Sequence, residues 1–266
     1  MIQVHRAIGA FSLLLLCLVP ARAAFAQTPS PSSPAKPAIQ EPPLPTVDQI
    51  VDNYIEASGG RAAWEKLNSR VSKGTVTVAA MNVSGPLEID EKAPNKLLVT
   101  VTISGSVFLQ GFDGTVGWSE DPQNGLREQA GAELAETKRE ADFYHPLDFR
   151  KLYARMSVTG IETVDERRAY VVEAEPPEGG NPDRIYFDAR TGLPLRVITQ
   201  HHNFDGSVED FREDFDDYRT VDGVKVPFAI EQSDAQVAFR IQIDEVRDNV
   251  ELKDSEFAKP AGPATQ

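Results

Sequence analysis

The sequence predicts an α+β domain built on a strongly curved, incompletely closed antiparallel β-barrel that is capped by a few helices. Three observations support this fold class. Strand-like runs rich in Val, Thr, Ile and Phe alternate apolar and polar residues with a period of two. Short turns that contain Gly separate these runs, so neighbouring strands must be antiparallel. About ten or eleven such strands in one sheet would curl and leave a concave apolar face for helices or a ligand to cover.

The N-terminus has the pattern of a secretory signal peptide. Arg6 precedes an apolar run at residues 7–19, and Ala24-Phe25-Ala26 forms a small-x-small cleavage site. The apolar run is shorter than the roughly 20 residues of a membrane-spanning helix. We therefore expect residues 1–26 to direct export to the periplasm and to be cleaved after Ala26. The rest of the chain is expected to comprise a disordered Pro-rich tether, one folded domain and a flexible tail, at residues 27–45, 46–258 and 259–266.

Two helices are expected to open the folded domain. Thr46 and Gln49 form a capping box, and apolar residues recur at helical spacing up to a Gly59-Gly60 exit. A second short helix is expected at residues 61–67. A charged amphipathic helix is expected at residues 132–143, with a continuation at residues 146–156 after a break. All of these helices need an apolar surface to cover.

Strand-like runs fill the remainder of the domain. Pro194 and Pro227 lack a backbone donor, so each is expected at a strand start, an edge or a bulge. Leu195 and Val197 are expected to share one face of their strand. Hairpin turns are expected at Asp113-Gly114, Asp205-Gly206 and Asp222-Gly223. The expected strands are residues 71–79, 83–90, 96–104, 106–112, 157–164, 168–175, 183–187, 193–198, 207–218, 224–232 and 236–246.

The composition excludes several classes of function. The formal net charge is −14 at pH 7, which argues against nucleic acid or an anionic membrane as a stable partner. The single cysteine, Cys17, lies in the expected signal peptide, so the mature chain has no thiol nucleophile, disulfide or cysteine metal site. The sequence has no G-x-S-x-G, H-E-x-x-H or phosphate-binding Gly loop. We therefore expect no cofactor and no catalytic residues.

Two groups of polar residues are candidates for metal sites. His201 and His202 are adjacent in a strand and point to opposite faces, so they cannot easily bind one metal ion. Asp205 and His145 could complete such a site only if the fold brought them near. The acidic run at residues 209–217 lacks the spacing of a calcium loop and is expected to form a solvated outer strand face. No metal ligands are predicted.

Four short motifs stand out along the chain. They are Val47-Asp48-Gln49-Ile50-Val51-Asp52-Asn53-Tyr54 with Gly59-Gly60; Gly111-Phe112-Asp113-Gly114 leading to Trp118; Ile185-Tyr186-Phe187-Asp188 with Thr191-Gly192-Leu193-Pro194; and Asp222-Gly223-Val224-Lys225-Val226-Pro227. Together they resemble the LolA/LolB-like superfamily of periplasmic lipoprotein carriers, in particular the outer-membrane lipoprotein-sorting proteins. The resemblance implies an unclosed antiparallel barrel capped by helices, with an apolar cavity that shields acyl chains in transit.

The apolar strand faces are the candidate binding surface. We expect them to hold a lipid or a lipoprotein acyl chain in a non-enzymatic protein, with the helices at residues 46–57 and 132–143 as a movable lid. The competing interpretation is that the same residues are simply core. The candidate cavity residues are Leu97, Val99, Val101, Ile103, Leu195, Val197, Phe211, Phe215, Phe228, Phe239 and Ile241.

Two other functions stay open at this point. The first is an interaction or sensor module that uses the same fold to recognise an envelope protein, with an envelope membrane protein as its partner. This module would show a filled core and an apolar surface patch. The second is a hydrolase, which would gather polar residues such as His201 or His202 in a cleft.

Overall fold

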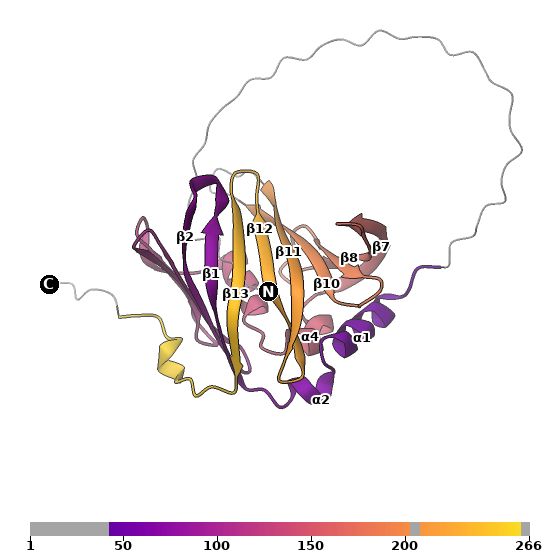
Figure 1. Ribbon diagram of the computed structural model, residues 1–266, viewed down its shortest axis with the longest axis horizontal. Helices are drawn as coiled ribbons and strands as arrows, with labels where there is room; N and C mark the ends of the chain where they lie inside the picture. Colours follow the sequence, from indigo (N-terminus) through magenta and orange to yellow (C-terminus); the bar gives the residue numbers. More distant parts are fainter. Residues whose placement is uncertain (1–42, 203–207, 262–266) are drawn as a thin grey trace, which may run out of the picture.

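A single antiparallel β-sheet forms the body of the protein (Figure 1). The computed structural model describes residues 43–202 and 208–261, so the predicted signal peptide, most of the tether, the Asp205-Gly206 turn and the end of the tail lie outside the described residues. The strands are β1 Ser69–Val78, β2 Val83–Lys92, β3 Lys96–Ile103, β4 Ser106–Phe112, β5 Gly117–Asp121, β6 Gly125–Glu128, β7 Arg155–Val164, β8 Arg167–Glu175, β9 Asp183–Asp188, β10 Pro194–His202, β11 Val208–Val221, β12 Val224–Ser233 and β13 Ala238–Asp248.

The sheet has 13 strands in the order β6-β5-β4-β3-β2-β1-β13-β12-β11-β10-β9-β8-β7. Almost every strand therefore pairs with its neighbour in sequence, as short hairpin connections require. The exception is the β1–β13 pair, which joins the first and last strands at the middle of the sheet. The strands β6 and β7 lie at the two edges, so the sheet is open.

Helices account for a small part of the fold. They are α1 Val47–Ala57, α2 Arg61–Trp64, α3 Gly131–Glu140 and α4 His145–Asp148, with three short 3-10 turns. The predicted capping box is confirmed: the Gln49 backbone N–H donates to Thr46 Oγ1 at 3.2 Å, and the Thr46 N–H donates to Gln49 Oε1 at 2.9 Å. None of the helices among the described residues has the length and apolar character needed to cross a membrane.

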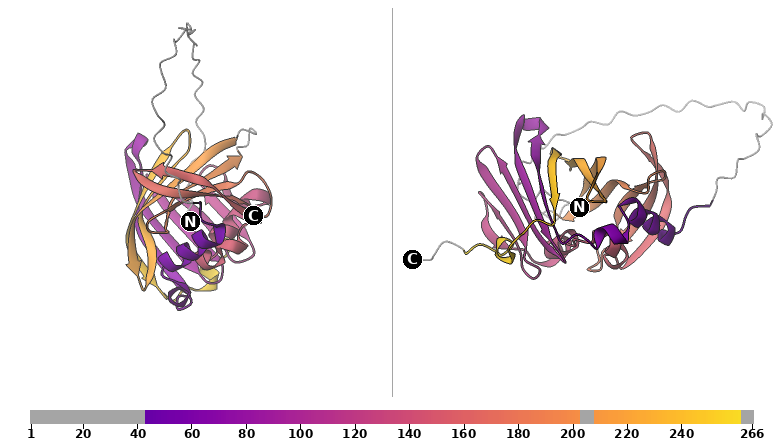
Figure 2. Two further views of the ribbon diagram at one scale, coloured as in Figure 1. Left: turned by 90° about the vertical axis from the view of Figure 1, so that its right-hand side faces the viewer. Right: turned by 60° about the horizontal axis from the view of Figure 1, so that its bottom comes forward.

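The apolar residues form one large core and one small cluster. Figure 2 shows that the sheet bends and that α1 lies against its concave side. Residues from α1, from both halves of the sheet and from the segment around α4 pack into a single buried core on that side. The small cluster lies on the opposite face of β7 to β10. The antiparallel sheet with a few helices is thus confirmed, although the chain is mostly β.

The two prolines lie where their missing donors cost least. Pro194 is the first residue of β10, and Pro227 lies in a part of β12 that has no β13 partner, so both expectations are confirmed. A bulge follows Pro194, because Pro194 pairs with Phe187 whereas Arg196 pairs with Tyr186. The bulge turns Leu195 into the small outer cluster while Val197 packs in the main core. The prediction that these two residues share a face is therefore wrong.

The segment that follows β13 returns to the outer side of the sheet (Figure 1). The Trp118 indole N–H donates to the backbone oxygen of Phe257 at 2.9 Å, and both side chains are buried. The Lys92 ammonium binds the backbone oxygen of Leu252 and the carboxylate of Asp254, each at 2.7 Å. A tight β5–β6 hairpin follows Trp118, and the Asp121 carboxylate closes it by accepting from backbone N–H groups of the turn.

Candidate functional site

The sheet splits along the lower half of β12. Its upper residues Ala229 to Ser233 pair with β13, but the register stops there, while β13 continues to pair with β1 as far as Asp248. Pro227 has no N–H to offer across this gap. The Gln242 side-chain amide donates instead to the Phe228 backbone oxygen at 3.0 Å, which satisfies one acceptor that the missing ladder leaves open. We call the gap between the lower half of β12 and β13 the seam.

The turn between α1 and α2 closes the lower end of the seam. The Lys225 backbone N–H donates to the Ser58 oxygen at 2.8 Å, so β12 is tied to the end of α1. Gly59 has φ +124°, and a Cβ there would lie 2.4 Å from the Gly223 oxygen. Only glycine allows such an approach with this backbone conformation. The Gly59-Gly60 exit and the Asp222-Gly223 turn, which are far apart in the sequence, therefore make direct backbone contact.

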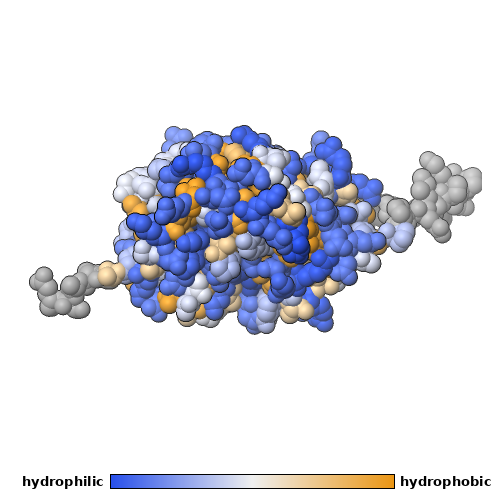
Figure 3. All heavy atoms as spheres, turned by 90° about the horizontal axis from the view of Figure 1, so that it is seen from below, coloured by the Kyte–Doolittle hydropathy of each residue, from blue (hydrophilic) through white to orange (hydrophobic). Residues whose placement is uncertain are grey.

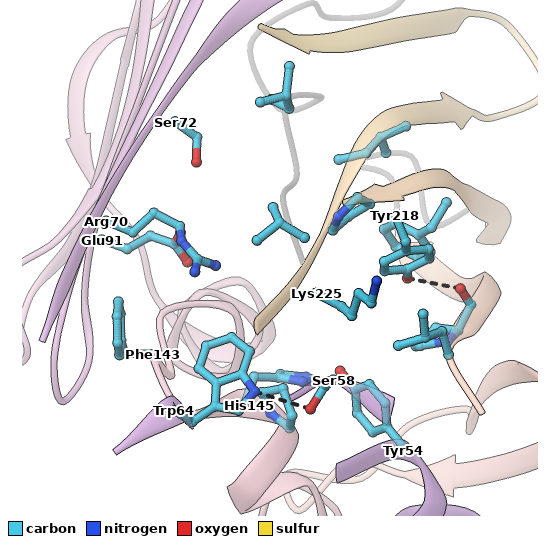
Figure 4. A pocket seen from close by; sticks show the side chains of 18 of the residues that line it. Tyr54, Ser58, Trp64, Arg70, Ser72, Glu91, Phe143, His145, Tyr218 and Lys225 are labelled. Carbon is cyan, nitrogen blue, oxygen red and sulfur yellow. Dashed lines mark hydrogen bonds between the residues drawn. The ribbon is translucent and has the colours of Figure 1, made fainter. Parts of the chain in front are cut away.

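A cavity of about 130 Å³ lies in the seam (Figure 4). Aromatic rings of the two N-terminal helices form its floor, where the Trp64 indole N–H donates to Ser58 Oγ at 3.1 Å. Its walls come from β1 and β2 on one side and from β10 to β12 on the other. The lining residues are Tyr54, Ser58, Trp64, Arg70, Ser72, Glu91, Asp142, Phe143, His145, Pro146, Leu193, Pro194, Phe215, Tyr218, Lys225, Val226, Pro227, Ile230 and Ile243.

The β1–β2 wall carries a neutralised arginine and an unpaired acid. Arg70 donates to both carboxylate oxygens of Asp248, at 2.7 and 3.1 Å, and both side chains are more than nine-tenths buried. The Arg70 guanidinium also lies 5.5 Å from the centre of the Trp64 ring. Glu91 is the cross-strand neighbour of Arg70. Within the described residues, the Glu91 carboxylate forms no ion pair and no side-chain hydrogen bond.

The opposite wall carries a lysine without a partner. Figure 4 shows the Lys225 side chain entering the cavity from the side of Tyr218. The Tyr218 hydroxyl donates to the Pro194 backbone oxygen at 2.9 Å, and Ser58 Oγ donates to the Ile55 oxygen at 2.8 Å. Both hydroxyl protons are therefore already used. No carboxylate in the part of the chain that the structure describes lies within ion-pair distance of the Lys225 ammonium.

Two further titratable groups border the cavity near α4. Burial raises the pKa of Asp142 to about 6, helped by the nearby negative charge of Asp148. The Oδ1 atom of Asp142 is buried and has no hydrogen-bond partner among the described residues. Burial lowers the pKa of His145 to about 3, so this imidazole is neutral at physiological pH. Its ring packs edge-on against Phe149, with the ring centres 5.6 Å apart.

The polar residues considered for a metal site lie partly outside the described residues. His145 lines the cavity, whereas His201 and His202 lie at the end of β10, and Asp205 falls outside the described residues. Residues 43–202 and 208–261 contain no cluster of three His, Cys, Asp or Glu side chains placed to hold a metal ion.

The expectation that the acidic residues 209–217 form a solvated outer face is wrong for Glu213. Glu213 is not solvated: its side chain lies on the same face as Phe211 and Phe215 and is 2% exposed. Its carboxylate accepts a hydrogen bond from the Gln232 side-chain amide at 2.8 Å, and Gln232 is fully buried. Burial raises the pKa of Glu213 to about 7. The period of two places residue 213 on the apolar face, and that signal was available from the sequence.

Most of the predicted cavity residues pack together. All of them are buried. Phe215 is the one member of the set that also borders the cavity in the seam. Leu195 belongs to the outer cluster, and Phe211 to neither cluster. The role of this set in binding a ligand stays a prediction. Its members in the main core are Leu97, Val99, Val101, Ile103, Val197, Phe215, Phe228, Phe239 and Ile241.

Sequence reasoning missed the polar residues of the cavity. Glu91, Asp142 and Lys225 come from three separate segments, and no local pattern links them. Lys225 stands inside one of the four motifs, at the start of the strand expected at residues 224–232. A sequence signal for the seam did exist in Pro227, which cannot donate to a neighbouring strand.

Three solved structures share this architecture. The LolA superfamily protein from Nitrosomonas europaea has a TM-score of 0.53 at 14% identity, with 81% of this chain and 99% of that chain covered. The protein has a LolA-like fold. A DUF1329 family protein from Desulfovibrio piger gives a TM-score of 0.54 at 13% identity over 80% of this chain and 97% of that one. A putative outer membrane lipoprotein-sorting protein domain from Vibrio parahaemolyticus gives 0.50 at 15% identity over 79% and 95%.

The likeness is one of structure. No family model matches the sequence, and no curated protein matches it either. Within the LolA-like fold, three of the four motifs meet around α1. Gly59 contacts the Gly223 turn, and a Cβ on Gly192 would lie 3.0 Å from the backbone oxygen of Asn53. The fourth motif contacts the C-terminal segment instead. Gly111 leaves room for the Trp118 ring, and the Trp118 indole N–H donates to the Phe257 backbone oxygen.

Proposed function

We propose that this protein is a non-enzymatic periplasmic carrier that holds the acyl chain of a lipid or lipoprotein on the concave side of its sheet, with the seam cavity as the point of attachment. The observation that carries the proposal is the aromatic-floored cavity where the sheet splits. In this proposal the bent sheet acts as an incompletely closed barrel around the chain. The LolA-like fold supports the class of function, and the expected signal peptide supports the location.

The size of the cavity sets what it can hold without movement. At about 130 Å³ it is close to the roughly 150 Å³ apolar cavity that accepts a benzene molecule. Phe215, Ile230 and Ile243 supply apolar wall on the side of the main core. A segment of three or four methylene groups would fit, and at about 0.8 kcal/mol each it would contribute about 3 kcal/mol. The rest of a long chain requires the helices to move away from the sheet.

The contacts of α1 are compatible with such movement. Arg150 links the segment after α4 to the carboxylates of Asp48 and Asp52, at 3.0 and 2.8 Å. Both aspartates are largely exposed, so these ion pairs contribute little to holding the helix. Seen from below, the surface is mainly hydrophilic with small apolar islands among the polar residues (Figure 3). The proposed lid therefore closes over the chain without presenting a broad apolar patch on this face.

Native mass spectrometry with lipid extraction tests the proposal on protein purified from the periplasm without detergent. We expect an acyl species at close to one per chain. The variant Ser72→Leu fills the cavity, because Ser72 is buried and lines it, and should lower uptake of a fluorescent fatty acid. Thr75→Leu on the other face of β1 is the control. A clean apo mass with no fatty acid uptake would refute the carrier and favour a module that binds an envelope protein.

A further inference from the structure

The seam cavity presents opposite charges on opposite walls. Lys225 enters from the side of β11 and β12, whereas Glu91 projects from the β1–β2 side (Figure 4). Asp142 also lines the cavity. These three groups have in common that they lack an ion-pair partner within the ranges the structure describes. We propose that the cavity recognises an amphiphile whose head group is zwitterionic, with a phosphate held by Lys225 and a primary ammonium held by Glu91 and Asp142. This inference rests on the proposed function and names its ligand class.

Lys225 is the group on its wall that can bind an anion. Its backbone N–H is fixed to Ser58, which holds the strand in place, and the neighbouring hydroxyl protons of Ser58 and Tyr218 are donated to backbone oxygens. A phosphate at this wall would therefore find one strong donor, the Lys225 ammonium. Charge-assisted hydrogen bonds of this kind are about twice as strong as neutral ones.

Arg70 is not available for an anion. Asp248 occupies two of its N–H groups from a fully buried position, and the guanidinium is stacked near the Trp64 ring. The Arg70–Asp248 pair is neutral as a unit. The charge that the β1–β2 wall offers to a ligand is therefore the carboxylate of Glu91.

Asp142 points to a ligand that donates hydrogen bonds. Its Oδ1 atom is buried beside the cavity with no donor among the described residues. A buried acceptor without a donor is costly, so such atoms are normally satisfied. A primary ammonium carries three N–H donors, so it can donate to more than one carboxylate. A quaternary ammonium has no N–H group and would leave Oδ1 unsatisfied.

A ligand with one charge fits this arrangement poorly. An anion alone would satisfy Lys225 but leave two carboxylates facing it, and a cation alone would leave Lys225 desolvated without a partner. The cavity would therefore discriminate between ligands by repelling those with one charge as well as by attracting those with two opposite charges. The wall charges therefore favour an ethanolamine-type phospholipid over phospholipids with choline or glycerol head groups and the same chains.

Isothermal titration calorimetry with short-chain phospholipids below their micelle concentration tests the inference on the periplasmic protein. Dihexanoyl lipids with phosphoethanolamine, phosphocholine and phosphoglycerol heads share the same chains. We expect the ethanolamine lipid to bind about tenfold more tightly than the other two. Glu91→Gln and Asp142→Asn should each reduce this preference without weakening the glycerol lipid. Lys225→Gln should weaken all three.

The outcomes separate this inference from the proposed function. Equal affinity of the wild-type protein for the three lipids would overturn head-group recognition and leave acyl binding standing. A preference that survives in both acidic variants would also overturn it. No binding of any of the three lipids would overturn both. The wild-type comparison needs no variant, so the inference remains testable even if a substitution prevents folding.

Discussion

Replacing Glu213 by Gln should change how the stability of the protein depends on pH. Burial raises the pKa of Glu213 to about 7 in the folded protein, against an ordinary value of 4.5. Between these values the unfolded chain loses this proton while the folded protein keeps it, so the free energy of unfolding falls as the pH rises. At 1.36 kcal/mol per pKa unit, the loss between pH 4.5 and 7 is about 3 kcal/mol. Below pH 4.5 both states are protonated and Glu213 makes no pH-dependent contribution.

Gln cannot ionise but can still accept the hydrogen bond from the Gln232 amide. Glu213→Gln should therefore be about as stable as wild type at pH 4 and more stable by up to about 3 kcal/mol at pH 8. Burial also raises the pKa of Asp183, to about 6, and the charge of Asp183 is one of the smaller causes that raise the pKa of Glu213.

Urea unfolding at pH 4, 5.5 and 8 measures the effect. Glu231→Gln is the matched control, because Glu231 adjoins Gln232 on β12 and its side chain is 57% exposed. Its effect on stability should be small at every pH. A stability difference between Glu213→Gln and wild type that stays constant from pH 4 to pH 8 would show that Glu213 is hydrated and refute the argument.

Three other substitutions test the packing around the motifs. Gly59→Ala should lower the free energy of unfolding by about 2 kcal/mol or more. The added Cβ would lie 2.4 Å from the Gly223 oxygen, and the backbone at residue 59 has a positive φ. Urea unfolding that matches wild type would contradict this expectation. Gly111→Ala should cost about 1–3 kcal/mol and shift the fluorescence of Trp118, whose ring lies 2.3 Å from the added Cβ. Thr46→Ala should cost about 1 kcal/mol in thermal unfolding, whereas Thr46→Ser should cost almost nothing.

Local rules predicted the elements well, because each rule acts within a few residues. Thr46 and Gln49 gave the start of α1, and the strand expected at residues 236–246 gave β13 with Phe239 and Ile241 buried. The rules failed where one residue changed the register or broke the expected polarity. The bulge at Leu195 moves that side chain to the other face. Glu213 occupies an apolar face as an acid that its burial keeps protonated up to about pH 7.

The site was less predictable because it depends on contacts between distant segments. Glu91 lies on β2 and Lys225 on β12, and the strands β1 and β13 lie between them in the sheet. No spacing in the sequence encodes the seam that brings their side chains to one cavity. The seam arises from a backbone without a donor at Pro227 and from the end of the β12–β13 register at Ala229. Only the three-dimensional pairing reveals which side chains then face each other.

The glycine motifs connect the fold to the site. As turns, Gly59-Gly60, Gly192 and Gly223 could belong to any antiparallel sheet, but in this structure they let backbones touch around α1. The contact of Gly59 with Gly223 fixes β12 against the floor of the cavity, and the hydrogen bond from Lys225 N–H to Ser58 keeps it there. Substitutions at these glycines should therefore alter ligand binding and the attachment of α1 together, whereas conservative changes in the alternating strands should alter stability alone.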